Sequence, residues 1–190
     1  MSVSSSLSPM RSDASAAVGG ALVTELKTRA RLGLKAIRAD DLGLLHRAKV
    51  GIGRAAAQPP EWKLRHCLTL AANEAGFTTW EQARRVLGGQ ATAGDDMGAG
   101  WHAPRCNGLL SHWFADHARA QICLAEMPRS VLLPYRRQFV VVDENYLREL
   151  GVPRAVEHWD AADRDLVSAY GGAAWLALCQ LRLTALREAR

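Results

Sequence analysis

The segment 101–117 carries the densest set of potentially reactive side chains in the sequence. It reads WHAPRCNGLLSHWFADH and contains His102, Cys106, His112, Asp116 and His117. Imidazole, thiolate and carboxylate are the groups that bind Zn²⁺, and they also act as nucleophile and base in covalent catalysis. If the chain has a reaction centre, we expect it in this segment.

Cys106 is the candidate nucleophile. We predict a helix over 108–126, which places Cys106 just before a helix start and beside Arg105, and both neighbours favour a thiolate of lowered pKa. The stretch CNGLLSHWF is similar to the motif of papain-like peptidases, in which a cysteine opens a helix. That resemblance implies a histidine on a later strand, whereas His158 falls in a predicted loop. If the chain is an enzyme, its predicted catalytic residues are Cys106 and His112.

A metal site is the second use of the same segment. On the predicted helix, His112 and Asp116 are four residues apart and share a face, so they can converge on one ion. The predicted ligand set adds His102 and Cys106, which would have to fold back over the predicted helix. Zn²⁺ is the metal that suits these four side chains. Ordinary packing and capping explain these residues better than a metal does, so no cofactor is predicted and Zn²⁺ stays the alternative. We predict that His117 is a core histidine.

Two arginine pairs are the candidate binding residues. Arg84 and Arg85 lie on the second helix of the stretch 68–87, which looks like a helix–turn–helix unit that reads DNA. The face that this helix buries argues against base reading. A DNA-reading unit of this type would bury position 85, which is an arginine here. Arg136 and Arg137 lie beside Tyr135 in a β-rich stretch and are suited to a phosphate or carboxylate. A solvated turn explains that pair as well.

The stretch 67–87, CLTLAANEAGFTTWEQARRVL, carries a family resemblance. Its Gly76, Phe77 and Trp80 resemble a short helical module, marked Gly-Phe-x-x-Trp, that precedes various bacterial domains, including some labelled as glyoxalase-superfamily proteins. The remainder resembles uncharacterised bacterial proteins. No metal ligand or catalytic residue comes with this resemblance.

Charge and composition favour an intracellular binding protein. The net charge is +5, and residues 21–90 hold twelve Lys or Arg against six Asp or Glu, a surplus of six. Such an excess can mark a surface for nucleic acid or an acidic protein, and it can equally serve to keep the four helices solvated. No apolar run is long enough for a membrane span or a secretory leader, so we expect a cytoplasmic protein with reduced cysteines.

The hydrophobic pattern predicts a mainly α fold of two small helical subdomains. We expect a disordered leader over 1–20, a basic four-helix subdomain over 21–88, a flexible linker over 89–100 and an α+β subdomain over 101–190. The second subdomain is predicted to hold one short β-hairpin at about 130–142, a short helix after Asp143 and helices near 160–170 and 173–189. We therefore predict a non-enzymatic protein that contacts nucleic acid or an acidic partner through its basic N-terminal half. The alternative is a Cys/His enzyme or metal protein centred on 102–117.

Overall fold

A computed structural model of the chain describes residues 10–39, 43, 46, 61–92 and 94–189. As predicted, the protein is mainly helical with one small antiparallel sheet. The helical elements are α1 (Met10–Arg38), α3 (Leu64–Glu74), α4 (Trp80–Leu87), a 3₁₀ turn (Pro104–Cys106), α5 (His117–Glu126), α6 (Glu144–Glu149), α7 (His158–Ala161) and α8 (Ala173–Glu188). The strands are β1 (Ser111–Phe114), β2 (Val131–Tyr135) and β3 (Gln138–Val142). The helix predicted over 40–52 lies outside the described residues, except for Gly43 and His46.

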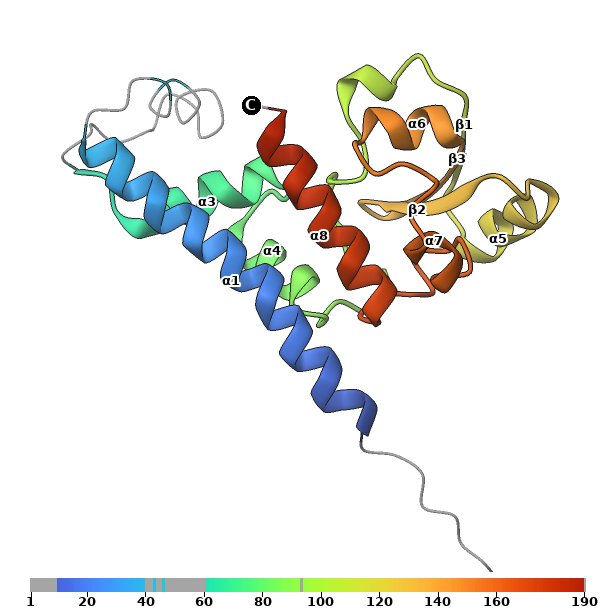
Figure 1. Ribbon diagram of the computed structural model, residues 1–190, viewed down its shortest axis with the longest axis horizontal. Coiled ribbons are helices and arrows are strands. Elements are labelled where there is room, and N and C mark those ends of the chain that lie inside the picture. Colours follow the sequence, from blue (N-terminus) through green and yellow to red (C-terminus); the bar gives the residue numbers. More distant parts are fainter. Residues whose placement is uncertain (1–9, 40–42, 44–45, 47–60, 93, 190) are drawn as a thin grey trace, which may run out of the picture.

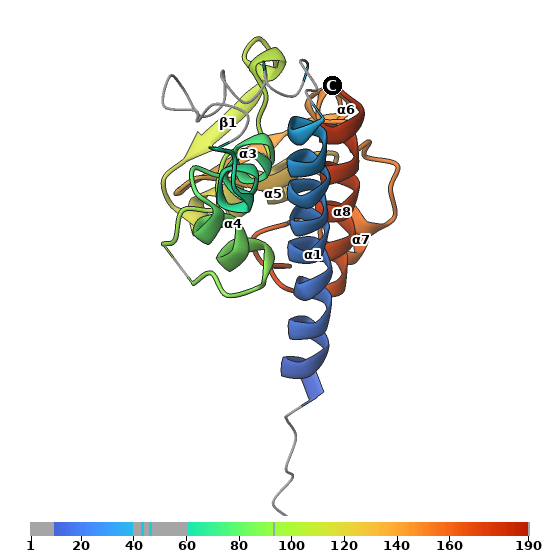
Figure 2. The same cartoon turned by 90° about the vertical axis from the view of Figure 1, so that its left-hand side faces the viewer.

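The helices α1 and α8 run side by side, with α3 and α4 against α1 (Figures 1 and 2). The spacing of five apolar residues predicts the inward stripe of α1: Leu22, Leu26, Ala30, Leu34 and Ile37. All of them are buried except Leu34, which is partly buried. The helix begins at Met10, well before the expected boundary near 22. Residues 10–20, which we expected in a disordered leader, therefore belong to α1.

The sheet has three strands in the order β1-β3-β2, one strand more than the predicted hairpin. Alternating side chains face opposite sides of a strand, so β2 and β3 each contribute to two cores. Leu132 and Val141 face α5, where they pack with Ala120 and Leu124. Val131, Leu133, Val140 and Val142 face the main core shared with α6, α7 and α8.

Strand β1 corrects the predicted helix over 108–126. The chain forms a 3₁₀ turn, then β1, and enters α5 only at His117. Asp116 sets that start, because its side chain accepts a hydrogen bond from the backbone N–H of Arg119. β1 supplies β3 with its second antiparallel neighbour, pairing Trp113 with Val140. Tertiary pairing therefore overrides the weak helical periodicity of this stretch.

The two predicted halves share one core, and the predicted linker over 89–100 packs between them. Leu26 of α1 and Trp175 of α8 belong to the same buried cluster as the sheet residues. The Ala99 N–H donates to Gly76 O at 2.7 Å, and the Arg182 guanidinium of α8 donates to Gly100 O at 2.7 Å. In the described part of the chain, no helix combines the length and apolar character of a membrane span.

Candidate functional site

The four predicted binding arginines line two adjoining depressions. Arg84, Arg85 and Arg137 line a depression of about 440 Å³, which we call the arginine hollow. Arg136 and Arg137 line a second, of about 310 Å³, which we call the histidine cavity because His117 forms part of its wall. Arg137 and Asp95 line both, so the two depressions meet at these side chains.

Helix α4 presents Arg84 and Arg85 outward. The residues that α4 buries are Ala83, Val86 and Leu87, which confirms the predicted phase against a DNA-reading helix. The Thr78-x-x-Glu81 spacing predicts a capping box, but the cap lies one residue later. Thr79 is the N-cap, and its hydroxyl accepts from the Gln82 N–H at 3.1 Å. The Gln82 carboxamide accepts in turn from the Thr78 N–H at 2.9 Å, which completes a reciprocal cap.

Arg136 and Arg137 form the two-residue turn between β2 and β3. Arg136 adopts a left-handed φ of 52° and is held by two backbone hydrogen bonds to the former linker. Its N–H donates to Gly98 O at 2.7 Å, and its carbonyl accepts from the Met97 N–H at 2.8 Å. The Arg136 guanidinium lies 5.6 Å from the centre of the Tyr135 ring, a cation–π contact. Neither guanidinium of the turn has an ion-pair or hydrogen-bond partner among the residues that the structure describes.

The arginine hollow itself is nearly balanced in charge. Glu81 pairs with Arg84 at 2.9 Å, and Asp95 pairs with Arg85 at 2.7 Å. Hydrogen bonds from the Thr92 N–H and hydroxyl, together with the charges of Arg85 and Arg137, lower the pKa of Asp95. Within the two depressions, the surplus positive charge therefore lies at the hairpin turn and not along α4.

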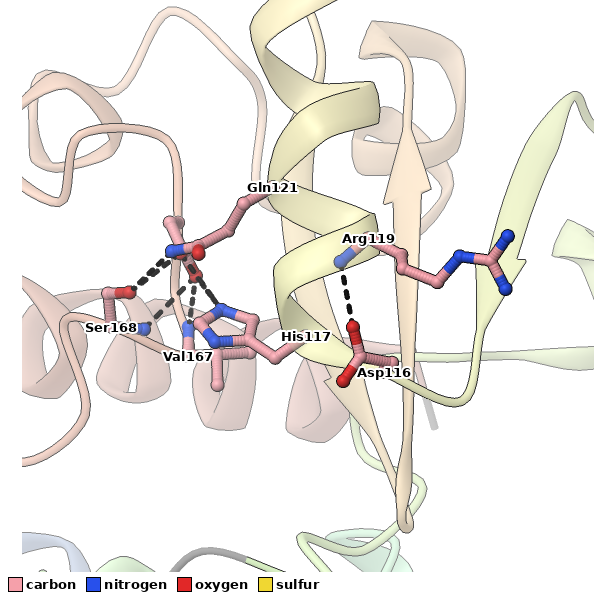
Figure 3. Close-up of polar contacts among 7 residues, drawn as sticks. Asp116, His117, Arg119, Gln121, Val167 and Ser168 are labelled. Carbon is pink, nitrogen blue, oxygen red and sulfur yellow. Dashed lines mark hydrogen bonds and ion pairs between the residues drawn. The ribbon is translucent and has the colours of Figure 1, made fainter.

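Behind the histidine cavity, His117 is bound to a buried aspartate (Figure 3). Its Nε2 lies 3.0 Å from Asp165 Oδ2, and its ring lies 5.1 Å from that of Phe139. The Asp165 side chain is 6% exposed and that of His117 29%. The same Oδ2 accepts from Ser168 Oγ at 2.7 Å and from Gln121 Nε2 at 2.9 Å. His117 is thus the half-buried partner of a carboxylate, and not the core histidine that we predicted.

The loop that carries Asp165 replaces the predicted helix near 160–170. Asp163 and Arg164 both have left-handed φ values, 49° and 61°. The Leu132 N–H of β2 donates to Arg164 O at 2.8 Å, and Leu132 O accepts from the Leu166 N–H at 3.0 Å. The loop therefore lies beside β2 and pairs with it in parallel at Leu132. This pairing places the Asp165 carboxylate against α5.

Asp165 is ionised despite its burial. Burial raises the pKa of the carboxyl, but hydrogen bonds from Ser168 and Gln121 and the neighbouring His117 outweigh it, and the net pKa is lowered. The Val167 and Ser168 N–H groups add two hydrogen bonds to Oδ1, each 3.0 Å long. A carboxylate that accepts this many hydrogen bonds is a fixed negative charge.

Cys106 does not have the surroundings of a nucleophile. It ends the 3₁₀ turn and is 1% exposed. Burial raises the pKa of its thiol, outweighing the Ala103 N–H and the charges of Arg182 and Arg105. The lowered pKa that we predicted from a helix start is therefore wrong.

The predicted metal ligands lie on separate elements. His112 is in β1 opposite Val141, and Asp116 is the cap of α5, so they do not share a helix face. His102 donates to or accepts from the Tyr146 hydroxyl at 2.6 Å and Asn107 Oδ1 at 2.9 Å, which occupies both ring nitrogens. Within the described residues, no three His, Cys, Asp or Glu side chains are grouped so as to hold a metal.

Sequence reasoning missed the residues that support His117. The Asp165-x-x-Ser168 spacing is typical of a local cap, and a cap alone was the most that it indicated. The pairing of Asp165 with a histidine 48 residues earlier depends on the loop docking to β2, which leaves no local pattern. In comparisons with known proteins, the chain matches no family model, no curated protein and no solved structure.

Proposed function

We propose that this protein binds single-stranded nucleic acid across the hairpin turn and the two depressions beside it. The observation that carries the proposal is the pair Arg136 and Arg137, whose guanidinium groups have no hydrogen-bond or ion-pair partner in the described part of the chain and stand at a cavity with aromatic walls. Guanidinium groups bind phosphate through paired, charge-assisted hydrogen bonds. Phe139 and Tyr170 line the same cavity, and aromatic rings stack on bases of any sequence.

The concave form of the site favours a flexible strand over a duplex. Duplex readers place a protruding helix in the major groove, whereas α4 spans eight residues and its Arg85 is tied to Asp95. A single strand can bend its phosphates along the turn and direct one base into the histidine cavity. This geometry supports nucleic acid binding without reading of base pairs.

An acidic protein partner is the competing occupant, and the site favours it less. The carboxylates of Glu81, Asp95 and Asp96 in the arginine hollow oppose any anion, so charge alone gives little net attraction there. A base gains stacking on Phe139 and Tyr170 that offsets this opposition, whereas an Asp or Glu side chain has no surface with which to stack.

Fluorescence anisotropy with a short labelled single strand tests the proposal. We expect saturable binding that Arg137→Ala weakens about tenfold, the effect of one lost charge-assisted contact. Arg148→Ala is the matched control, because Arg148 is 63% exposed and pairs with Glu144 on α6, outside both depressions. Equal weakening by both variants, or displacement of the strand by polyglutamate at equal charge concentration, would contradict the proposal.

A further inference from the structure

The histidine cavity contains an oriented proton acceptor. Asp165 is an ionised acceptor 3.0 Å from His117 Nε2, so this nitrogen carries the proton of the neutral ring. The lone pair of the neutral ring is then on Nδ1. No described residue occupies Nδ1 by a hydrogen bond. Figure 3 shows the His117 ring joined by a dashed line on one side only, which is the Nε2 contact with Asp165.

The cavity pairs this acceptor with two cations, and the nucleophilic groups in its described lining are all engaged. Arg136, Arg137 and His117 line it together. Neither serine nor cysteine is among its described lining residues. The Thr92 hydroxyl donates to Asp95 at 2.9 Å, the Tyr170 hydroxyl donates to Val86 O at 2.8 Å, and the Asp95 carboxylate is paired with Arg85. A reaction in this cavity therefore suits a substrate that brings its own nucleophile beside an anionic centre.

We propose that this cavity cleaves single-stranded RNA, with His117 as the general base and the ribose 2′-hydroxyl as the nucleophile. The inference rests on the proposed function, because the strand must first lie along the turn. RNA carries a hydroxyl next to each phosphodiester, which is the combination that the lining requires.

In the reaction, His117 Nδ1 accepts the proton of the 2′-hydroxyl, and the 2′-oxygen forms a bond to the adjacent phosphorus. The bond from phosphorus to the 5′-oxygen breaks, and that oxygen takes a proton from water. The hydroxide left behind is neutralised by the proton on His117, which restores the free base. Arg136 and Arg137 hold the phosphoryl oxygens, where negative charge grows in the transition state. The products are a 2′,3′-cyclic phosphate end and a 5′-hydroxyl end.

Asp165 acts in this scheme as a positioning residue. Its carboxylate fixes both the tautomer and the orientation of the His117 ring. We expect Asp165→Asn to lower the maximal cleavage rate and leave KM unchanged, because the residue does not reach the strand. A purely structural role would instead lower the active fraction, which titration with the non-cleavable DNA strand measures separately.

The test follows cleavage of a labelled RNA strand by gel electrophoresis and identifies its new ends by mass spectrometry. General base catalysis contributes on the order of 100-fold or more, so we expect His117→Gln to slow cleavage by about that factor. Binding of the same sequence as DNA should be unchanged in this variant. His158→Gln is the matched control, since His158 is also half-buried but begins α7, outside the cavity.

The outcomes separate this inference from the proposed function. RNA that binds and stays intact overturns the cleavage inference and leaves the binding proposal standing. Cleavage that persists in His117→Gln, or that produces ends other than a cyclic phosphate and a 5′-hydroxyl, also overturns it. Failure of both RNA and DNA to bind overturns the proposed function itself.

Discussion

Replacing Asp165 by asparagine tests whether this carboxylate organises the wall of the histidine cavity. Its Oδ2 accepts from Ser168 Oγ, Gln121 Nε2 and His117 Nε2 at 2.7, 2.9 and 3.0 Å. In the variant, an NH₂ group takes the place of one oxygen and faces donors. A buried donor without a partner costs about 1–3 kcal/mol. His117 and Gln121 can turn partly to water, so we predict a loss of about 2–4 kcal/mol in the free energy of unfolding.

Thermal unfolding followed by circular dichroism measures this loss. For a chain of this length, each kcal/mol lowers the Tm by about 2–4 °C, so Asp165→Asn should lower it by about 5–15 °C. Asp163→Asn is the matched control: Asp163 is exposed, has a φ of 49°, and asparagine tolerates that conformation. We expect the control to stay within about 0.5 kcal/mol of the parent. Equal Tm values for the two variants would refute the reasoning.

Three further predictions follow from single contacts. The pKa of Asp165 is lowered in the folded protein, so its stabilisation is present above the ordinary carboxyl pKa of about 3.9 and is lost as pH falls through the lower folded value. Urea midpoints of wild type and Asp165→Asn should therefore converge below about pH 4, and a constant gap would contradict this. Gly76→Ala should cost about 2–4 kcal/mol in chemical unfolding, because φ is +90° and a Cβ would lie 2.4 Å from Gly100 N. Gly108→Ala, with no atom within 4 Å of its Cβ, should be near neutral, and equal losses would argue against the close approach. The raised thiol pKa and burial of Cys106 predict much slower labelling by a thiol reagent in the native protein than in urea. Equal rates at Cys106 would show that the site is open.

The parts of the fold that were predictable depend on local rules. The stripe of α1, the stop at Gly76 and the cap of α6 by Asp143 follow from spacing, from a glycine at positive φ and from a carboxylate that accepts the Tyr146 N–H. β1 was not predictable, because SHWF is only four residues long and is stabilised by pairing with β3, from which it is separated by residues 115–137. For the same reason His112, which we expected on a helix, lies on a strand.

The arginines of the candidate site were predictable from the sequence, but the way in which the fold brings them together was not. Sequence singled out Arg84, Arg85, Arg136 and Arg137 by charge and composition, and they line adjoining depressions because the segment 97–98 hydrogen-bonds to the hairpin turn. We predicted that segment 97–98 belongs to a linker, because the glycines and acidic residues around it offer few apolar side chains to bury. The pairing of His117 with Asp165 left no pattern in the sequence, because it forms only through the tertiary docking of the Asp165 loop.

The salt dependence of single-strand binding tests the central claim most directly. Each phosphate contact contributes a slope of about −0.7 to a plot of log affinity against log salt concentration. We predict that the double variant Arg136→Ala/Arg137→Ala makes this slope shallower by about 1.4 relative to wild type, whereas Arg148→Ala leaves it unchanged. A slope that is the same in all three proteins would show that the hairpin arginines do not hold phosphate, and it would contradict the proposed function.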